Sequence, residues 1–436
     1  MQGVFGLAVI LLLASSCSYS MQQMMPWKMT DYFDLESQNN DYATAFFGND
    51  EQKLLAGSAN SMSFNVMNYG AAGNGQTDDS EAFKKAWSEV CSATSRDDVP
   101  TLFVPEGKTF VVNQIAFMGP CKSNSIRFQI QGTVAAPQTT SWSQDSFGSL
   151  LRFRKIDNLI VEGSGTIDGQ GARWWNACIR KPDFVFVLDF SACNGVQLKG
   201  LTHVNSPRAH VTVHGCKDVT ISDIKITAPE KSPNTDGIDI SSSSNIKIQD
   251  STIATGDDCV AINGGASFVN ITGVKCGPGH GISIGSLGDG GDYDTVEEVH
   301  VSNCQLIKTT NGVRIKTFQG ASGYARKISF EHITLENVEN PIIIDQHYED
   351  KSKKPKMDSA SKAAAIKLSD ITYSDLHGTS NSDYAINLNC DDNIGCSGIK
   401  MKDVDITSAV PGKSTLASCQ NAHGTADSTQ PKVPCL

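Results

Sequence analysis

An eight-residue pattern recurs along the second half of the chain and limits the fold more than any other feature. The pattern is apolar, any, apolar, any, any, apolar, any, apolar. It fits VTISDIKI (219–226), VNITGVKC (269–276), VHVSNCQL (299–306), ISFEHITL (328–335), IKLSDITY (366–373) and IKMKDVDI (399–406). IKIQDSTI (246–253) fits except at Ser251. The alternation on each side predicts two short strands, and the two central residues mark a bend between them.

Repeats that begin 23 to 38 residues apart, with strands and almost no helix, predict a solenoid, and here a parallel β-helix. Each coil would stack on the previous one about 4.8 Å away, with inward Val, Ile and Leu forming a continuous core. We therefore expect a single all-β domain over residues 63–436. A β-sandwich or a propeller is the alternative, but Asn-Gly turns that join equal hairpins are not prominent.

Both ends of a solenoid need a cover, because an uncovered strand edge promotes aggregation. The acidic segment TDDS precedes one amphipathic helix, expected over residues 79–91. Its apolar face consists of Phe83, Ala86, Trp87, Val90 and Cys91. We expect this helix to plug the first coil and the cysteine-rich tail to cover the last.

The first residues resemble a leader. MQGVFGLAVILLLASSCSYS has an apolar stretch from Leu7 to Ala14 followed by small residues, which is typical of a secretory signal peptide, although a positively charged start is missing. We expect residues 1–20 to be a signal peptide. Residues 21–62 would be an N-terminal extension or pro-segment, with a flexible tail as the alternative. No later stretch reaches about 18 apolar residues, so we expect a soluble, exported protein.

Thirteen cysteines agree with export, because disulfides persist in oxidising compartments. Cys17 lies in the expected signal peptide, which leaves an even number whose pairing cannot be read from spacing. Cys178, Cys193 and Cys216 lie far apart and no Cys-x-x-Cys pair occurs, so a zinc site is not expected. The acceptor triplet at 270–272, Asn-Ile-Thr, fits a secreted glycoprotein, although such triplets also arise by chance.

The formal net charge of −11 argues against partners that need a basic surface. Nucleic acid and anionic membranes both bind through Lys and Arg, so neither is expected. A polymeric anion bound by a local basic patch remains compatible, because net charge describes the whole surface rather than one cleft.

Three polar motifs follow one another at nearly one-coil spacing: NTDGID (234–239), TGDDC (255–259) and GPGHGIS (277–283). Asp236 precedes Asp257 by 21 residues, and Asp258 precedes His280 by 22. At this coil length the chain returns to the same face one layer on, so these carboxylates and the imidazole would form a column. Neighbours in a regular strand point to opposite faces, so we expect the chain to turn after Gly256 and present both aspartates to one groove.

Each motif alone has a purely structural interpretation. Asp in NTDG or GDD can form an Asx-turn, and a single histidine is as often a hydrogen-bonded structural residue. Together they indicate acid and base chemistry, because neighbouring carboxylates resist ionising together and one keeps a proton. Inverting glycosidases separate the acid and base by about 6.5 to 9.5 Å and retaining ones by about 5 Å. Stacked coils can supply either spacing.

Two cations are expected one coil beyond this column. In NGVRIKT, Arg314 and Lys316 are two residues apart and share one face of a strand, with Ile315 turned to the core. They could compensate the charge of the carboxylates or bind the carboxylate of an anionic substrate, which Arg314 could bind bidentately. Tyr348 could offer a surface to a sugar ring, or be a rim residue.

NTDG, GDD, GHG and RIK, in this order and at these spacings, resemble the motifs of the polygalacturonases of glycoside hydrolase family 28. CGPGHGISIGSLG and NVMNYGAAGNGQTDDSEAFKKAW are similar to the plant type, and the resemblance covers about residues 63 to 436. It implies a right-handed parallel β-helix that hydrolyses α-1,4-linked galacturonan in pectin with inversion. It also implies an enzyme without metal or organic cofactor. We expect a monomer whose partner is the pectin polymer.

The same resemblance implies a catalytic role for each residue of the column. Asp257 would be the general acid that protonates the glycosidic oxygen. Asp236 and Asp258 would activate the attacking water, and His280 would tune or orient the acid. Clustered carboxylates of this kind predict an acidic pH optimum.

Substrate contacts and disulfides are implied in the same way. Arg314 and Lys316 would bind the galacturonate carboxylate, and Asn234 and Tyr348 would line the substrate site. The implied disulfides join Cys259 with Cys276, Cys390 with Cys396 and Cys419 with Cys435. Asp239 stands where many plant members carry His, which leaves the fine choice of substrate open. Glu349 stands where many carry Cys, which leaves a different disulfide set possible.

Other functions fit the scaffold less well. A rhamnogalacturonan or xylogalacturonan hydrolase is the second candidate, although paired Arg314 and Lys316 favour unsubstituted galacturonate. A pectate lyase would need calcium and a basic residue that abstracts a proton, and the complete carboxylate column argues against it. A non-catalytic wall-binding or allergen-like β-helix usually loses a catalytic residue, and none is missing here. Endo or exo cleavage depends on loops at the cleft ends, which the sequence does not specify.

Overall fold

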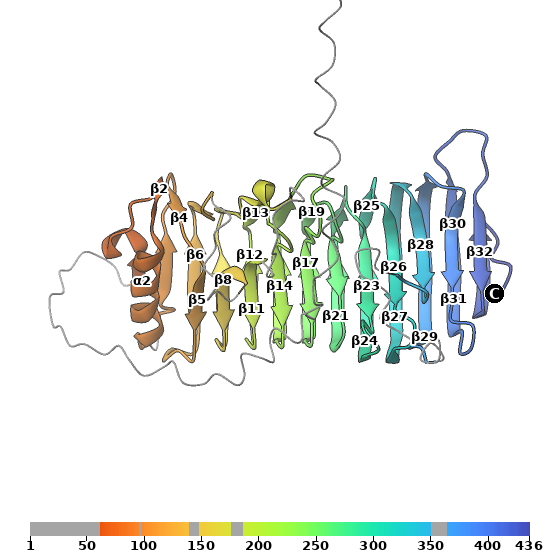
Figure 1. Cartoon of the computed structure of the whole chain (residues 1–436), viewed down its shortest axis with the longest axis horizontal. Helices are drawn as coiled ribbons and strands as arrows, with labels where there is room; N and C mark the ends of the chain where they lie inside the picture. The colour runs from red at the N-terminus through yellow and green to blue at the C-terminus, as the bar shows by residue number, and fades with distance from the viewer. Residues whose placement is uncertain (1–61, 96–97, 139–147, 176–185, 350–363) are drawn as a thin grey trace, which may run out of the picture. The chain divides into compact units, whose positions relative to one another are not determined.

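A computed structural model describes residues 62–95, 98–138, 148–175, 186–349 and 364–436 (Figure 1). The expected signal peptide and almost all of the N-terminal extension lie outside these residues. One compact unit, Ala59–Tyr348 with Met357–Leu436, is a parallel β-helix, as the repeat predicts.

The strands of the β-helix belong to two parallel sheets, one of 11 strands and one of 22. The 11-stranded sheet contributes one strand to each of 11 successive coils, and its strands lie side by side along the stack (Figure 1). They are β5 (Ile115–Met118), β8 (Ser149–Arg154), β11 (Phe186–Ser191), β14 (Val211–His214), β17 (Ile238–Ser241), β20 (Val260–Ile262), β23 (Ile282–Leu287), β26 (Asn311–Thr317), β28 (Asn340–Asp345), β30 (Tyr384–Asn389) and β32 (Leu416–Gln420).

The 22-stranded sheet forms two rows, which merge where β25 pairs with β27. The first row is β1 (Ser63–Asn65), β3 (Thr101–Val104), β6 (Ile126–Ile130), β9 (Leu159–Glu162), β12 (Gln197–Lys199), β15 (Lys217–Ser222), β18 (Ser244–Gln249), β21 (Ala266–Thr272), β24 (Tyr293–Ser302), β27 (Ser322–Val338), β29 (Lys367–Ser380), β31 (Cys396–Ser408) and β33 (Ala422–Gln430). The second row is β2 (Asn74–Asp78), β4 (Thr109–Val111), β7 (Thr133–Ala135), β10 (Thr166–Asp168), β13 (Thr202–Val204), β16 (Lys225–Thr227), β19 (Thr252–Ala254), β22 (Lys275–Cys276) and β25 (Gln305–Ile307).

The predicted bend occurs at the second central residue of each repeat, which adopts a left-handed backbone conformation. The residues at this corner are Asp223, Asp250, Gly273, Asn303, His332, Asp375 and Asp403. Gly, Asn and Asp reach positive φ at low cost, which explains most of this column. The one mismatch of the pattern, Ser251, is buried and satisfied: its hydroxyl donates to the Gln249 carbonyl at 2.8 Å and accepts from the Ile224 amide at 3.3 Å.

One repeat was assigned in the wrong register. IKLSDITY (366–373) matches the pattern, but Ile328 of β27 pairs with Ile371, so the equivalent repeat is ITYSDLHG (371–378). Asp370 bends the chain at the other corner of the coil instead. Both corners are flanked by alternating apolar residues, so the pattern fits either of them.

The core is a set of straight columns, because parallel strands in register place like positions above one another. Ile240, Ile262, Ile284, Ile315 and Ile344 pair through five successive coils and are fully buried. Each such side chain contributes roughly 2 kcal/mol through burial. The outward positions between them are free to carry chemistry.

A helix covers the first coil as expected. This helix, α2 (Ser80–Ser92), buries Phe83, Ala86, Trp87 and Val90 and packs on β1, β3 and β5 (Figure 1). The Asp79 side chain does not cap it; that carboxylate accepts from the Ala72 amide at 2.6 Å instead. The described residues contain no other α-helix, only the 3-10 turns η2 (Val66–Tyr69) and η3 (Gly171–Arg173). None of the described helices is long and apolar enough to cross a membrane.

Four disulfides form among the described residues. The three pairs implied by the resemblance are confirmed: Cys259–Cys276, Cys390–Cys396 and Cys419–Cys435. The last of them ties the C-terminal tail, with buried Val433, to the final coils. A fourth, Cys91–Cys121, joins the end of α2 to the chain before β6 and was not anticipated, because Cys91 was read only as part of the apolar helix face. Buried and unbridged cysteines in the described residues are Cys193, Cys216 and Cys304, whereas Cys178 lies outside them.

Candidate active site

The predicted column of acidic residues and histidine exists, and loops that enter three successive strands of the 11-stranded sheet form it. Asp236 lies just before β17, Asp257 and Asp258 just before β20, and His280 just before β23. Main-chain hydrogen bonds hold these loops together. The Gly237 amide donates to the Asp258 carbonyl at 2.8 Å, and the His280 amide donates to the Asp257 carbonyl at 2.8 Å.

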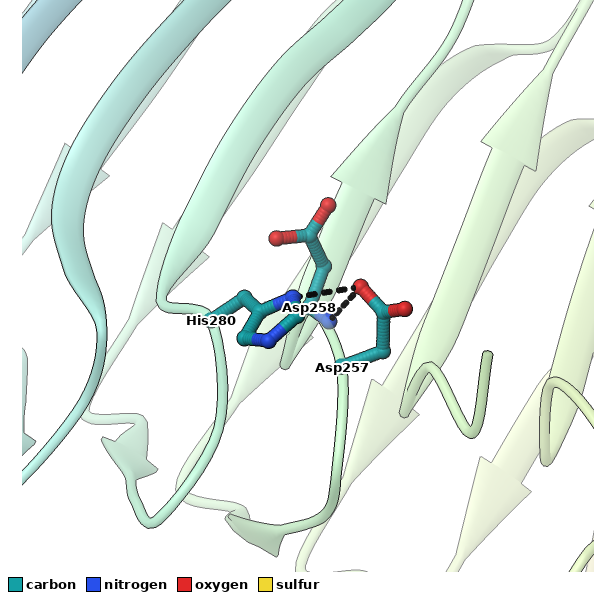
Figure 2. Close-up of side chains that lie close together, drawn as sticks. All are labelled: Asp257, Asp258 and His280. Atoms are coloured by element: carbon teal, nitrogen blue, oxygen red, sulfur yellow. Dashed lines mark hydrogen bonds and ion pairs between the residues drawn. The ribbon is translucent and has the colours of Figure 1, made fainter. Parts of the chain in front are cut away.

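The segment TGDDC is a turn, so its adjacent aspartates reach one site (Figure 2). A Cβ at Gly256 would lie 2.0 Å from the Ser232 carbonyl oxygen, so close packing rather than a positive φ requires glycine. The Asp258 amide donates to Oδ1 of Asp257 at 2.8 Å, which fixes this carboxylate beside its own main chain. Asp257 is half-buried and Asp258 is buried.

Asp257 is paired with the histidine of the next coil. Nδ1 of His280 lies 2.9 Å from Oδ1 of Asp257 (Figure 2). This hydrogen bond raises the pKa of His280 above its ordinary value, although burial opposes the shift. In mildly acidic solution the imidazole is therefore protonated, and it places a proton directly beside Asp257.

Asp258 is paired with both predicted cations. Nη2 of Arg314 lies 2.7 Å from Oδ1 of Asp258, and Nζ of Lys316 lies 3.0 Å from Oδ2. The Ser283 hydroxyl donates to Oδ1 at 2.8 Å and accepts from Nε of Arg314 at 2.9 Å. Burial alone would raise the pKa of Asp258, but the two positive charges outweigh it and hold the pKa below its ordinary value. Asp258 is therefore the ionised carboxylate of the site.

Both cations come from β26 as predicted, with Ile315 buried between them. Of the two interpretations left open, charge compensation is the one seen directly, since both groups contact Asp258. Lys316 also lies 5.5 Å from the ring centroid of Tyr348, so the aromatic ring borders the cationic part of the site. An edge-on contact with Phe318, at 5.2 Å between ring centroids, holds this ring.

Two carboxyl groups of the site have raised pKa values. Burial raises the pKa of Asp236 well above its ordinary value, and the charges of Asp257, Asp239 and Asp258 add to the effect. Burial raises the pKa of Asp239 to about 7, helped by Asp258 and Asp257 and opposed by Arg208 and Lys316. The expected division into protonated and ionised carboxyl groups is present. One protonated member is Asp236, for which the resemblance implies a role in activating water.

Sequence reasoning connected Asp239 only with the fine choice of substrate and assigned no role to Ser283. Asp239 alternates with buried Ile238 and Ile240 on β17, and Ser283 follows buried Ile282 on β23. The period of two was a signal that could have placed both on the outward face. Asn234, by contrast, is exposed in the segment before β17, and within the described residues its side chain makes no hydrogen bond to Asp236, Asp257, Asp258 or His280.

A buried histidine, His210, is hydrogen-bonded to the main chain of Asp236. Nδ1 of His210 lies 3.0 Å from the Asp236 carbonyl oxygen, and the His210 amide donates to the same oxygen at 2.9 Å. Nε2 accepts from the Ser206 amide at 3.2 Å. Burial lowers the pKa of His210 to about 4, so the ring is neutral in mildly acidic solution. The sequence carried no signal for this contact, because His210 precedes β14 without a recognisable motif.

Asp257, Asp258 and His280 each place one donor atom within 4.8 Å of the others, and among the described residues they form the group that could hold a metal ion. A metal there would compete with existing contacts, because Asp258 is bonded to Arg314 and Lys316 and Asp257 to His280. The donor set therefore fits an acid and base pair better than a metal centre.

Comparison with known proteins adds the family context. The family described as glycosyl hydrolases family 28 matches residues 91–430. A protein named as a probable polygalacturonase in Arabidopsis thaliana is 46% identical over 378 residues, which cover 86% of this chain and 81% of that protein. An exopolygalacturonase of Zea mays is 40% identical over 383 residues, which cover 86% of this chain and 90% of the other. The crystal structure of the endo-xylogalacturonan hydrolase from Aspergillus tubingensis superposes with a TM-score of 0.72 at 25% identity, covering 85% of this chain and all of that one.

Proposed function

The chain belongs to the glycosyl hydrolases of family 28 and is a glycoside hydrolase, and we propose that it is a secreted polygalacturonase that cleaves α-1,4-galacturonosyl linkages of pectin with inversion. The observation that carries the proposal is the division of charge in the column. Asp258 is held ionised by two cations, whereas the neighbouring Asp257 shares a 2.9 Å hydrogen bond with His280, which can supply it with a proton.

Asp257 is the general acid in this proposal. Its carboxyl group gives a proton to the glycosidic oxygen as the bond from that oxygen to the anomeric carbon breaks. His280 supports the step, because its imidazolium lies 2.9 Å from Oδ1 and can return a proton to Asp257 after each turnover. Asp257 is also the less buried of the two adjacent aspartates, which suits contact with the leaving sugar.

Asp258 and Asp236 hold the attacking water. Asp258 is the base that accepts a proton from it, because Arg314 and Lys316 keep this carboxylate ionised in acid. Asp236, whose raised pKa leaves it protonated in the free site, orients the water by hydrogen bonding. The water oxygen bonds to the anomeric carbon on the face opposite the departing oxygen, which inverts the configuration.

Arg314 and Lys316 also bind the substrate. A galacturonate carboxylate that approaches the cations from the side of Tyr348 would share them with Asp258, and the Tyr348 ring would border the sugar. In the described residues Nη1 of Arg314 has no hydrogen bond, so it can donate to this carboxylate. Binding of an anion here lowers the net positive charge around Asp258 and makes that carboxylate a stronger base.

Export to the cell wall is part of the proposal. The four disulfides support it, because such bonds persist in oxidising compartments and are rare in the cytosol. The substrate is a polymer of the wall, which an enzyme of this kind meets only outside the cell.

A xylogalacturonan hydrolase is the second candidate, and the structural similarity to an enzyme of that name favours it. The two candidates differ in whether the pocket tolerates a xylose branch on the galacturonan backbone. Parallel assays on polygalacturonic acid and on xylogalacturonan therefore separate them. The primary proposal expects the higher kcat/KM on the unbranched polymer.

The decisive experiment is a time course with polygalacturonic acid at about pH 5, in the presence of a chelator, with all products resolved. A spread of oligomers means endo cleavage, and monomer alone means exo cleavage. Products that absorb in the ultraviolet mean a lyase. NMR of the first product reports the anomeric configuration, and the β-anomer is the expected result. The absence of any product from either polymer rejects the proposal.

A further inference from the structure

Phe268 is an exposed aromatic residue in a backbone conformation that bulky residues rarely adopt. Its φ is 54° and its side chain is 54% exposed, on β21 at a corner of the coil. For an aromatic side chain this left-handed conformation costs on the order of 1 kcal/mol. Phe268 is only partly buried, and within the described residues its ring pairs with no other aromatic ring and no cation.

The other members of the same corner show how unusual this residue is. The register of the first row of the 22-stranded sheet places one left-handed residue per coil at this corner. The column consists of Asp218, Asn245, Phe268, Glu298, Lys327, Asp370 and Gly398. All the others are glycine or have polar side chains that water solvates, so Phe268 is the one apolar member.

Two residues further along the same strand lies Asn270. Val269 and Ile271 point into the core and are fully buried, whereas Asn270 points outward and is exposed. Its neighbours in register are Lys247 on β18 and His300 on β24, both exposed. Asn270 also begins the acceptor triplet that ends at Thr272, so the structure presents an accessible acceptor beside an uncovered aromatic ring.

We propose that Asn270 carries an N-linked glycan whose first N-acetylglucosamine packs against the ring of Phe268. Two residues of extended chain span about 6.6 Å, which a sugar attached to the Asn270 amide nitrogen bridges. The apolar C–H face of the sugar covers the aromatic ring, and its hydroxyl groups remain in water. The glycan supplies the partner that the exposed Phe268 otherwise lacks.

The modification is a group transfer from a lipid-linked pyrophosphate oligosaccharide, the donor class of the secretory pathway. The amide nitrogen of Asn270 bonds to the anomeric carbon of the donor sugar. The bond from that carbon to the pyrophosphate oxygen breaks, the lipid pyrophosphate leaves with the electron pair, and the amide loses one proton. This inference rests on the secretion in the proposed function, and it is independent of the hydrolytic activity.

The position of the glycan leaves catalysis unaffected. Asn270 lies on β21 of the 22-stranded sheet, whereas the catalytic column adjoins β17, β20 and β23 of the 11-stranded sheet. Removal of the glycan is therefore expected to change the unfolding temperature and to leave kcat and KM on polygalacturonic acid unchanged.

The test uses full-length chain secreted from a eukaryotic host. Peptide mass spectrometry measures occupancy of Asn270, with Asn270→Gln and Thr272→Val as unglycosylated controls. The packing is measured on wild type and Phe268→Asn, each before and after enzymatic removal of the glycan. Asparagine suits the left-handed corner and creates no new acceptor triplet, so this variant removes the ring without straining the fold.

The expected results are occupancy of Asn270 in the wild type and a fall of about 1 to 2 °C in its unfolding temperature on deglycosylation. The same treatment of Phe268→Asn should cause a smaller fall. An unmodified Asn270 in secreted, active enzyme overturns the glycan, and equal falls in both proteins overturn the packing. A glycosylated chain that cleaves no galacturonan rejects the proposed function instead and leaves this inference standing.

Discussion

His210 and Asp236 are joined twice through one oxygen, since both the imidazole Nδ1 and the main-chain amide of His210 reach the Asp236 carbonyl, at 3.0 and 2.9 Å. Nε2 of the same ring accepts a hydrogen bond from the Ser206 amide. The neutral imidazole of His210 therefore links the segment at Ser206 to the loop that carries Asp236. We therefore expect the placement of the Asp236 carboxyl group to depend on His210, which is fully buried.

Two substitutions of His210 separate these contacts. His210→Asn keeps a donor near the position of Nδ1, and His210→Gln keeps a polar atom near the position of Nε2 that faces Ser206. If the contact with the carbonyl positions Asp236, kcat falls roughly tenfold more in the glutamine variant than in the asparagine variant, with little change in KM. Unfolding temperatures measured in parallel control for a loss of fold. Equal kcat values in two equally stable variants would contradict this role.

Acid should destabilise the fold through its buried histidines. Burial lowers the pKa of His203 to about 3, and within the described residues neither ring nitrogen has a hydrogen-bond partner. The folded state keeps this ring neutral while the unfolded chain binds a proton below about pH 6.5. Stability is therefore fully present above that pH and is lost as the pH falls towards 3. Between pH 6.5 and 4.5 the loss is roughly 2 kcal/mol for this residue.

His203→Leu tests that linkage, because the neighbours of His203 in register, Ile167 and Ile226, are apolar. Urea unfolding at pH 7.5 and 4.5 should show a variant more stable than the wild type, with the larger difference in acid. A difference that is independent of pH would rule out the titration of this histidine as the cause.

Replacement of Asp257 by Asn should reduce kcat on polygalacturonic acid by about 10² to 10⁴, because the proton donor is lost while the volume is kept. On a galacturonide with an activated aryl leaving group the loss should be much smaller, since that group departs without protonation. Asp236→Asn is the matched control and should be impaired on both substrates. If the activated substrate restores turnover in the Asp236 variant and not in the Asp257 variant, then Asp236 is the proton donor. The raised pKa of Asp236, which keeps its carboxyl group protonated, would explain that result.

Removal of one cation should shift the acid limb of the pH profile. Lys316 helps to hold the pKa of Asp258 low, so Lys316→Met raises that pKa and protonates the base at a higher pH. The midpoint of the acid limb of kcat/KM should move up by about one pH unit. Asp258→Asn in the same background should remove the limb. An unmoved limb with a raised KM would assign Lys316 to substrate binding alone.

The fold was largely predictable from sequence, because each coil of a solenoid repeats the same pattern of apolar and polar residues. The inward columns, such as Ile240 to Ile344, require an apolar residue at every second position in each coil, and that requirement is what the eight-residue pattern reported. The pattern misplaced the repeat at 366–373 because two corners of a coil have the same apolar flanks. Ser251 departs from the apolar pattern, but the fold accommodates it because its buried hydroxyl donates a hydrogen bond to a main-chain carbonyl.

The placement of the acidic residues and His280 in one column was predictable for the same reason, since residues nearly one coil apart lie on one face. The sequence left two interpretations of Arg314 and Lys316 open, charge compensation of the carboxylates and binding of the substrate. Spacing along the chain does not decide between them, and the structure shows that both cations contact Asp258. The contact of His210 with Asp236 was not predictable. It runs through a main-chain oxygen that every residue possesses, so no side-chain pattern marks it.

The distance in sequence between Asp258 and the cations that pair with it has a consequence for folding during synthesis. Arg314 and Lys316 follow Asp258 by 56 and 58 residues, so the ribosome completes the coil that buries this carboxylate before it completes β26. Until β26 docks, the nascent stack holds several acidic groups with little to neutralise them, and a buried unpaired charge is strongly destabilising. We expect the capped N-terminal coils to assemble layer by layer during synthesis, and the layer that holds Asp258 to become stable only when β26 arrives.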